Sequence, residues 1–268
     1  MLENPQITPI TNAGYPVGMH RLEYTSGGLR DRAIFRPPVN GSHDWIVMLH
    51  GHGAHETQLF MRQEVRRAWL PAYLKMGIGI LSPNLRNNGW MAPMAVQDMD
   101  DMLDFLREKY HAERFFFTGA SMGASCNLMY GMLRPRNVSG IVARGAATEL
   151  PSYLAFCRAN QLAYPLLREI ADDILAAFGG TPEELPAVYR RQSALYHPEA
   201  LADIPVFLMH GSRDELIPVS QSRRFAAAMA ETRRFVYVEI PGGNHDSPLP
   251  FSETDPPFAP LAWVMDNA

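Results

Sequence analysis

The sequence predicts an α/β fold built on a doubly wound, mostly parallel sheet. Short continuous apolar runs, typical of strands buried on both faces, alternate along the chain with longer segments of helical periodicity. This β-α-β alternation favours parallel strands joined by right-handed crossovers. With 268 residues, of which 47% are apolar and 19% charged, the chain has enough core-forming side chains for one large domain. We therefore expect residues 1–268 to form a single domain.

The expected elements begin with two strands, 18–24 and 29–35, that are joined by a glycine turn. The apolar run at 45–49 is the first expected central strand. Helical spacing over 58–75 ends at Gly77, a residue that suits a helix C-cap. The other expected features are an irregular arm at 1–15, strands 78–81, 114–118, 140–143, 206–209 and 235–240, and helices 96–110, 124–132, 222–230 and 260–266.

A segment at about 148–200 is too long for a simple crossover between strands. Residues 150–178 have a helical pattern that Gly179 and Gly180 interrupt, and Thr181 then begins a capping-box-like start of another helix. We expect this insertion to be a small helical cap over the strand ends, where ligand crevices of open sheets lie. The alternative is a structural insertion that never touches a ligand.

Composition and charge exclude several classes of function. A formal net charge of −4 and a pI near 6.1 provide no basic field for nucleic acid. Two cysteines, Cys126 and Cys157, exclude a disulfide framework and leave only a single bridge open. The N-terminus lacks the pattern of a signal peptide, and no apolar run is long enough for a membrane span. A cytoplasmic location is the default expectation, and the oligomeric state is not indicated.

The stretch Gly119-Ala120-Ser121-Met122-Gly123 lies between an expected strand and an expected helix. A serine between two glycines at such a junction suits a sharp strand-to-helix turn that leaves the hydroxyl at the top of the sheet. The pentapeptide alone occurs by chance in about one chain in ten of this length. Its position between the two elements makes Ser121 a candidate nucleophile.

A serine nucleophile needs a base to take its proton and an acid to orient that base. Asp214 follows the expected strand 206–209, and His245 follows the expected strand 235–240. Both lie beyond the carboxyl ends of parallel strands, the edge at which Ser121 also lies, and the order Ser, Asp, His is that of nucleophile-elbow hydrolases. Asp246 and, less strongly, Glu215 compete with Asp214 for the role of the acid. Taken singly, Asp214 suits a turn or helix N-cap and His245 an ordinary loop position.

Acyl transfer also needs backbone N–H groups that face the developing oxyanion. Met122, the residue after the serine, is expected to supply one of them. The second is expected from the glycine-rich loop 50–53, with His52 favoured over Gly53. A rival interpretation of this loop is a metal site, because His50, His52, His55 and Glu56 are all metal-ligand types. Their spacing is not that of a helical zinc motif, so we expect no metal.

Four residues just past the expected strand 78–81 are candidates for the lining of a substrate pocket. They are Arg86, Trp90, Met91 and Met94. The alternative for Arg86 is a purely structural ion pair. A methionine is more often a core filler than part of a binding surface.

Several stretches resemble the prolyl oligopeptidase family of serine hydrolases, and nearly the whole chain resembles the α/β-hydrolase superfamily. The stretches are Asn84-Leu85-Arg86, Phe178-Gly179-Gly180-Thr181-Pro182-Glu183-Glu184 through Tyr189, Ser193-Ala194-Leu195, Ile204-Pro205-Val206 and the run from His210 to Pro218. The resemblance implies an α/β-hydrolase fold, Ser121 as nucleophile, His245 as base, Asp214 as orienting acid, and no cofactor.

Two departures from that family shape the expected activity. The segment before the strand 45–49 is too short for the N-terminal propeller of the family's peptidases, so we expect none. The expected oxyanion loop carries His52 at the place where the resemblance to those peptidases implies a tyrosine. We therefore expect a serine hydrolase that cleaves small carboxylic esters through an acyl-enzyme. Peptidase or amidase activity, thioesterase activity, and a non-catalytic ligand-binding fold are the alternatives.

Overall fold

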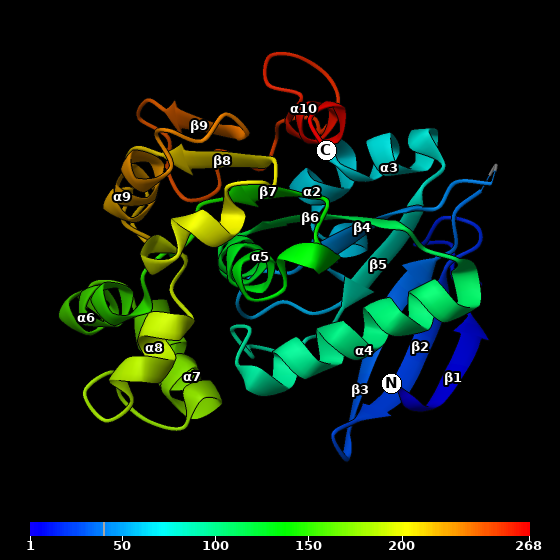
Figure 1. Cartoon of the computed structure of the whole chain (residues 1–268), viewed down its shortest axis with the longest axis horizontal. Coiled ribbons are helices and arrows are strands. Elements are labelled where there is room, and N and C mark those ends of the chain that lie inside the picture. The colour runs from blue at the N-terminus through cyan, green and yellow to red at the C-terminus, as the bar shows by residue number, and fades with distance from the viewer. Residues whose placement is uncertain (40) are drawn as a thin grey trace.

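The computed structural model of the chain describes residues 1–39 and 41–268. Within them, nine strands form one sheet in the order β1-β2-β3-β5-β4-β6-β7-β8-β9 (Figure 1). Their bounds are β1 Glu3–Pro9, β2 His20–Ser26, β3 Leu29–Arg36, β4 Asp44–Leu49, β5 Gly79–Pro83, β6 Arg114–Ala120, β7 Gly140–Arg144, β8 Val206–Gly211 and β9 Phe235–Ile240. The pairs β1–β2, β2–β3 and β3–β5 are antiparallel, and the pairs from β5 through β4, β6, β7 and β8 to β9 are parallel. The expected doubly wound, mostly parallel sheet is confirmed.

Helices cover both faces of this sheet (Figure 1). Apolar side chains of α1, α2, α3 and α10 pack on one face, and those of α4, α5 and α9 pack on the other. The helix bounds are α1 Gln58–Met61, α2 Gln63–Ala68, α3 Leu70–Met76, α4 Pro93–Tyr110, α5 Met122–Leu133, α6 Leu150–Asn160, α7 Leu166–Phe178, α8 Pro186–Arg191, α9 Ser220–Ala228 and α10 Pro260–Asp266. No helix in the described residues is long and apolar enough to cross a bilayer.

Strand β4 shows why the central strands have continuous apolar sequences. Its side chains alternate between the two faces, so that Trp45 and Val47 enter one core while Ile46 and Met48 enter the other. All four are fully buried. Because helices cover both faces, neither set of alternate positions meets water, and both sets are apolar.

The structure differs from the sequence expectation in the N-terminal arm and in the segment 58–75. The arm contains β1, which is held by backbone pairing to β2. Its side chains are mostly exposed, so its sequence shows no apolar alternation that would predict a strand. The segment 58–75 forms three short helices. Arg62, between α1 and α2, has an extended backbone with φ −77° and ψ 117°. Pro71 lies at the start of α3, and because it has no N–H it cannot continue the hydrogen bonds of α2. Gly77 ends the third helix in the left-handed region, as predicted.

The segment expected to form a cap contains α6, α7 and α8, which gather at one end of the molecule (Figure 1). Its expected helix start at Thr181 is wrong: Thr181 and Glu184 do exchange capping-box hydrogen bonds, but α8 begins only at Pro186. Leu185 lies outside helical geometry between the two, at φ −126° and ψ 49°. The side-chain bonds therefore close an isolated turn.

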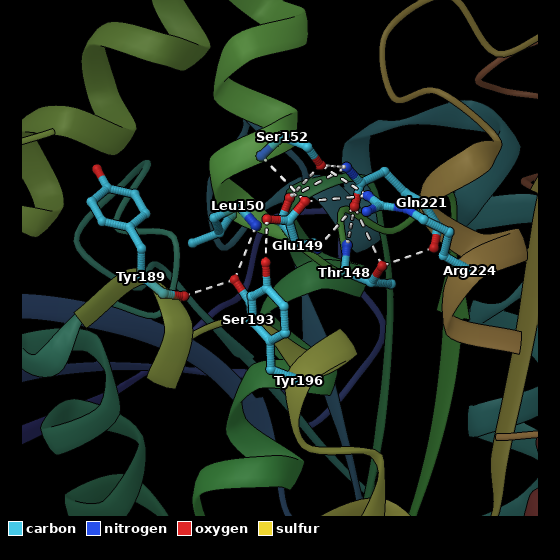
Figure 2. Close-up of polar contacts among 9 residues, drawn as sticks. All are labelled: Thr148, Glu149, Leu150, Ser152, Tyr189, Ser193, Tyr196, Gln221 and Arg224. Carbon is cyan, nitrogen blue, oxygen red and sulfur yellow. Dashed lines mark hydrogen bonds and ion pairs between the residues drawn. The ribbon is translucent and has the colours of Figure 1, made fainter. Parts of the chain in front are cut away.

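Gln221 of α9 ties the start of α6 to the body of the protein (Figure 2). Its side-chain oxygen accepts the N–H groups of Thr148 and Glu149 at 3.0 and 2.8 Å, and its amide nitrogen donates to Ser152 at 2.9 Å. All these groups except Ser152 are buried. Since unpaired buried amides are costly, this network fixes where the first cap helix leaves the sheet.

A buried ion pair links β7 to the C-terminal segment below the carboxyl edge of the sheet. Arg144 donates to Glu253 at 2.7 Å, and both side chains are fully buried. Thr118 bridges them, because it receives a bond from Arg144 and donates to Glu253, each at 3.0 Å. Tyr73 donates to the same carboxylate, and the guanidinium lies 4.2 Å from the ring centroid of Trp69. The pair thereby connects β6, β7, α2–α3 and the C-terminal segment.

Replacing Glu253 by glutamine should destabilise the protein by about 3 kcal/mol or more, because it leaves a buried guanidinium without its counter-charge. The free energy of unfolding in urea measures this. The exposed pair of Arg114 and Asp44 is the matched control: Arg114→Met should cost less than about 1 kcal/mol. Equal costs for the two variants would contradict the structural role assigned to the buried pair.

Candidate active site

Ser121 lies at a sharp turn between β6 and α5. Its backbone has φ 58° and ψ −123°, a strained conformation for a residue with a side chain. The flanking glycines are required by packing: a Cβ atom at Gly123 would come within 2.1 Å of the carbonyl oxygen of Leu49, and one at Gly119 within 2.8 Å of it. The turn therefore needs Gly119 and Gly123, and it projects Ser121 at the carboxyl edge of the sheet.

Asp214 and His245 meet at the same edge, from the loops that follow β8 and β9. The Nδ1 atom of His245 lies 2.7 Å from Oδ2 of Asp214. The other oxygen of Asp214 accepts the backbone N–H groups of Leu216 and Ile217 at 2.9 and 2.8 Å. The carboxylate is thus held on one side by its own loop and presents the other side to the imidazole.

The charge of Asp214 is stabilised by its hydrogen bonds despite burial. Burial by itself would raise the pKa of this carboxyl, but bonds from His210 and His245 outweigh it and hold the pKa well below the ordinary value. Asp214 is therefore an anion throughout the neutral range. An anion at this place fixes the proton of His245 on Nδ1 and leaves Nε2 free to accept one.

Ser121 and His245 line one small cleft. Its volume is about 20 Å³, room for about one water molecule. The other lining residues are Gly51, Gln58, Arg62, Val65, Ala120, Asp246 and Leu249. Gly51 belongs to the loop after β4, and a Cβ atom there would lie 3.8 Å from that of Ser121. Three segments far apart in sequence therefore converge on the serine.

The two competing acids have other surroundings. Asp246 also lines the cleft, where it forms an ion pair with Arg62 at 2.8 Å, and it is more than half exposed. Glu215 is half-buried beside Asp214. Of the three carboxylates considered from sequence, Asp214 is the one that contacts the imidazole.

The expected oxyanion donors differ in their availability. Met122 is the first residue of α5, and the N–H groups in a first helical turn have no partner within the helix. Gly53 donates its N–H to Oδ1 of Asn88 at 2.8 Å. His52 lies in the same loop directly after Gly51. Of the two loop residues, Gly53 therefore already has an acceptor for its N–H.

The side chain of His52 points away from solvent. It lies 3.5 Å from Asp173 of α7 and 3.4 Å from Asn88, and its ring faces Trp90 at a centroid distance of 6.3 Å. Burial lowers the pKa of the imidazole below its ordinary value, against a smaller opposing effect of Asp173. Asn88 also donates to Asp173 at 2.7 Å. Through Asn88, the loop 50–53 is therefore linked to α7.

The four residues expected to line a pocket lie in different surroundings. Arg86 clamps Asp98 of α4 and the carbonyl of Ser26, which is the structural alternative considered from sequence. Arg86 and Met94 also line a cavity of about 540 Å³, which shares no lining residue with the cleft at Ser121. Trp90 and Met91 are buried in the core.

The histidine cluster of the oxyanion loop is not arranged as a metal site. His50 has both ring nitrogens against backbone carbonyls, at 2.8 Å from Gly51 and 2.7 Å from Asn84. Among the residues that the structure describes, no group of three His, Cys, Asp or Glu side chains could hold a metal ion. The two cysteines are free and buried, and burial raises the pKa of Cys157 to about 11.

Sequence reasoning missed one residue of this site. His210, the penultimate residue of β8, places Nε2 3.1 Å from the same oxygen of Asp214 that His245 contacts. The signal was present, because His210 stands four residues before Asp214 at the carboxyl end of its strand. Nothing in the spacing, however, indicates whether a histidine there turns toward the loop or toward the core.

Solved structures share this fold at low sequence identity. A Mycobacterium tuberculosis puromycin-hydrolyzing peptidase matches with a TM-score of 0.65 and 19% identity over 90% of this chain. This chain spans only 36% of the length of that peptidase. An S-formylglutathione hydrolase from Agrobacterium tumefaciens matches with a TM-score of 0.69 and 14% identity, covering 97% of this chain and 99% of that one. A Pyrococcus furiosus esterase matches with 0.67 and 17%, covering 99% and 96%.

No curated protein matches the chain in sequence. A family model does: residues 33–229 match BD-FAE, a domain of the α/β-hydrolase type. The match spans β3 through α9 and includes Ser121 and Asp214. The resemblance to α/β hydrolases and to prolyl-oligopeptidase-like peptidases is thereby confirmed. The chain belongs to the BD-FAE family of α/β-hydrolase-type domains.

Proposed function

We propose that the protein is a serine hydrolase that cleaves carboxylic esters through an acyl-enzyme. The observation that carries the proposal is the 2.7 Å contact between His245 and Asp214 beside the cleft that Ser121 lines. An imidazole with its Nδ1 proton held by a buried anion is the base that a serine hydroxyl needs. The family and the esterase among the similar folds support the same class of chemistry.

In the proposed mechanism, Oγ of Ser121 attacks the ester carbonyl while Nε2 of His245 takes its proton. The backbone N–H groups of Met122 and His52 stabilise the oxyanion. His245 then protonates the leaving alcohol, which departs and leaves an acyl-serine. A water molecule, deprotonated by His245, then attacks the acyl carbonyl, the carboxylic acid departs, and His245 returns the proton to Oγ of Ser121. Asp214 stays ionised throughout and stabilises the imidazolium that forms twice in each cycle.

Ser121→Ala should lower kcat toward short p-nitrophenyl esters by at least about 10⁴-fold, because it removes the nucleophile. The same variant should not react with a fluorophosphonate probe, whereas the wild-type protein should carry the label on Ser121. Mass spectrometry of the labelled peptide checks the site. A wild-type protein with neither turnover nor label would sink the proposal, and unchanged activity in Ser121→Ala would favour a non-catalytic binding fold.

Asp214→Asn should lower kcat by about 10³- to 10⁴-fold, because an amide cannot hold the Nδ1 proton of His245 in the same way. The neighbouring carboxylates serve as matched controls. Glu215→Gln should change kcat less than about 3-fold. Asp246→Asn removes an exposed ion pair from the lining of the cleft and should lower kcat far less than Asp214→Asn does. A larger loss in Asp246→Asn than in Asp214→Asn would reassign the acid.

An amide or thioester bond is the second proposed target for the same three residues. The puromycin-hydrolyzing peptidase and the S-formylglutathione hydrolase among the similar folds favour keeping it. Amides need stronger protonation of the leaving group than esters do, so the ratio of their kcat/KM values is diagnostic. Matched acyl esters, thioesters and aminoacyl amides should be compared. A preference for the amide or the thioester would overturn the ranking.

A further inference from the structure

His210 forms a second contact with the oxygen of Asp214 that faces His245. Its Nε2 atom lies 3.1 Å from Oδ2 of Asp214 and 2.9 Å from the carbonyl oxygen of Ile217. The opposite ring nitrogen, Nδ1, lies 2.6 Å from the hydroxyl of Ser222 in α9. His210 and Ser222 are completely buried. Both ring nitrogens of His210 therefore have hydrogen-bond partners.

These partners determine which nitrogen of His210 carries the proton. A carbonyl oxygen only accepts hydrogen bonds, so the contact with Ile217 requires a proton on Nε2. Oδ2 of Asp214 lies 3.1 Å from the same nitrogen, beside this contact. In the neutral imidazole Nδ1 has a lone pair, and the hydroxyl of Ser222 can donate to it. Ser222 thereby fixes the tautomer in which His210 donates to Asp214.

The carboxylate of Asp214 has four donors and about four lone-pair directions to receive them. Leu216 and Ile217 occupy one oxygen, and His210 and His245 share the other. Rotating the carboxylate would break bonds on both oxygens at once. With His210 absent, His245 alone would hold Oδ2, while the two backbone bonds on Oδ1 would remain. The carboxylate could then tilt about Oδ1 with the ring that it is required to orient.

We propose that His210, with its tautomer fixed by Ser222, is a positioning residue that holds Asp214 in place for His245. The proposal rests on the role of Asp214 and His245 under the proposed function. His210 touches neither the serine nor the substrate cleft, and it acts only through Asp214. Its loss should therefore lower kcat and leave KM nearly unchanged, because the substrate meets the same surface.

The test compares His210→Met with His210→Gln. Methionine fills the buried space without a donor, whereas the glutamine amide can place an N–H near the position of Nε2. The assay measures kcat and KM for a p-nitrophenyl ester, with kcat expressed per site that a fluorophosphonate titrates, so that misfolded protein is not counted. His210→Met should lose about 10- to 100-fold in kcat with KM within about 3-fold of wild type, and His210→Gln should recover most of the loss.

Two serine variants provide the matched comparison. Ser222→Ala removes the donor to Nδ1 and should lower kcat by about 3- to 10-fold. Ser26→Ala removes another buried hydroxyl that bonds a carboxylate, Asp101 at 2.9 Å, far along the sheet on β2. It should leave kcat unchanged while costing similar thermal stability. If His210→Met does not fold, His210→Gln and Ser222→Ala decide.

Three outcomes would overturn the positioning role. They are a kcat per titrated site in His210→Met within about 3-fold of wild type, a glutamine variant no better than the methionine variant, and a Ser222→Ala variant indistinguishable from Ser26→Ala. Failure of the proposed function looks different, because the wild-type protein itself would then neither turn over esters nor react with the fluorophosphonate.

Discussion

The backbone contact between the serine turn and the end of β4 is the constraint on which the rest of the site depends. Gly123 approaches the carbonyl of Leu49 so closely that no side chain fits between them. The loop that contains Gly51 and His52 begins directly after Leu49. The same contact therefore sets the strained conformation of Ser121 and its distance from the proposed oxyanion donors. Any residue larger than glycine at 123 would separate Ser121 from that loop.

The buried charge of Asp214 is stabilised by hydrogen bonds. Desolvation disfavours the ionised carboxylate, and hydrogen bonds to the charged form offset that cost. Two of the donors are backbone N–H groups of its own loop, and two are imidazoles from β8 and the loop after β9. This arrangement leaves the side chain one orientation. An acid that cannot rotate keeps His245 in the tautomer that proton transfer requires.

The cap is connected to this machinery at two places. Gln221 fixes the point where α6 leaves the sheet (Figure 2), and Asn88 joins the oxyanion loop to Asp173 of α7. The cleft at Ser121 itself has room for little more than a water molecule, and none of its lining residues belongs to the cap segment.

The sequence by itself determined the sheet and the convergence of Ser121, Asp214 and His245. Apolar runs identify strands buried on both faces, and the fixed handedness of crossovers brings the carboxyl ends of parallel strands to one edge. Only the tertiary structure decided the partners of those residues. It shows that Asp214 contacts the imidazole of His245, whereas Asp246 pairs with Arg62. It also shows that His210 lies against Asp214. Such choices depend on distances between segments remote in sequence, and neither periodicity nor spacing encodes them.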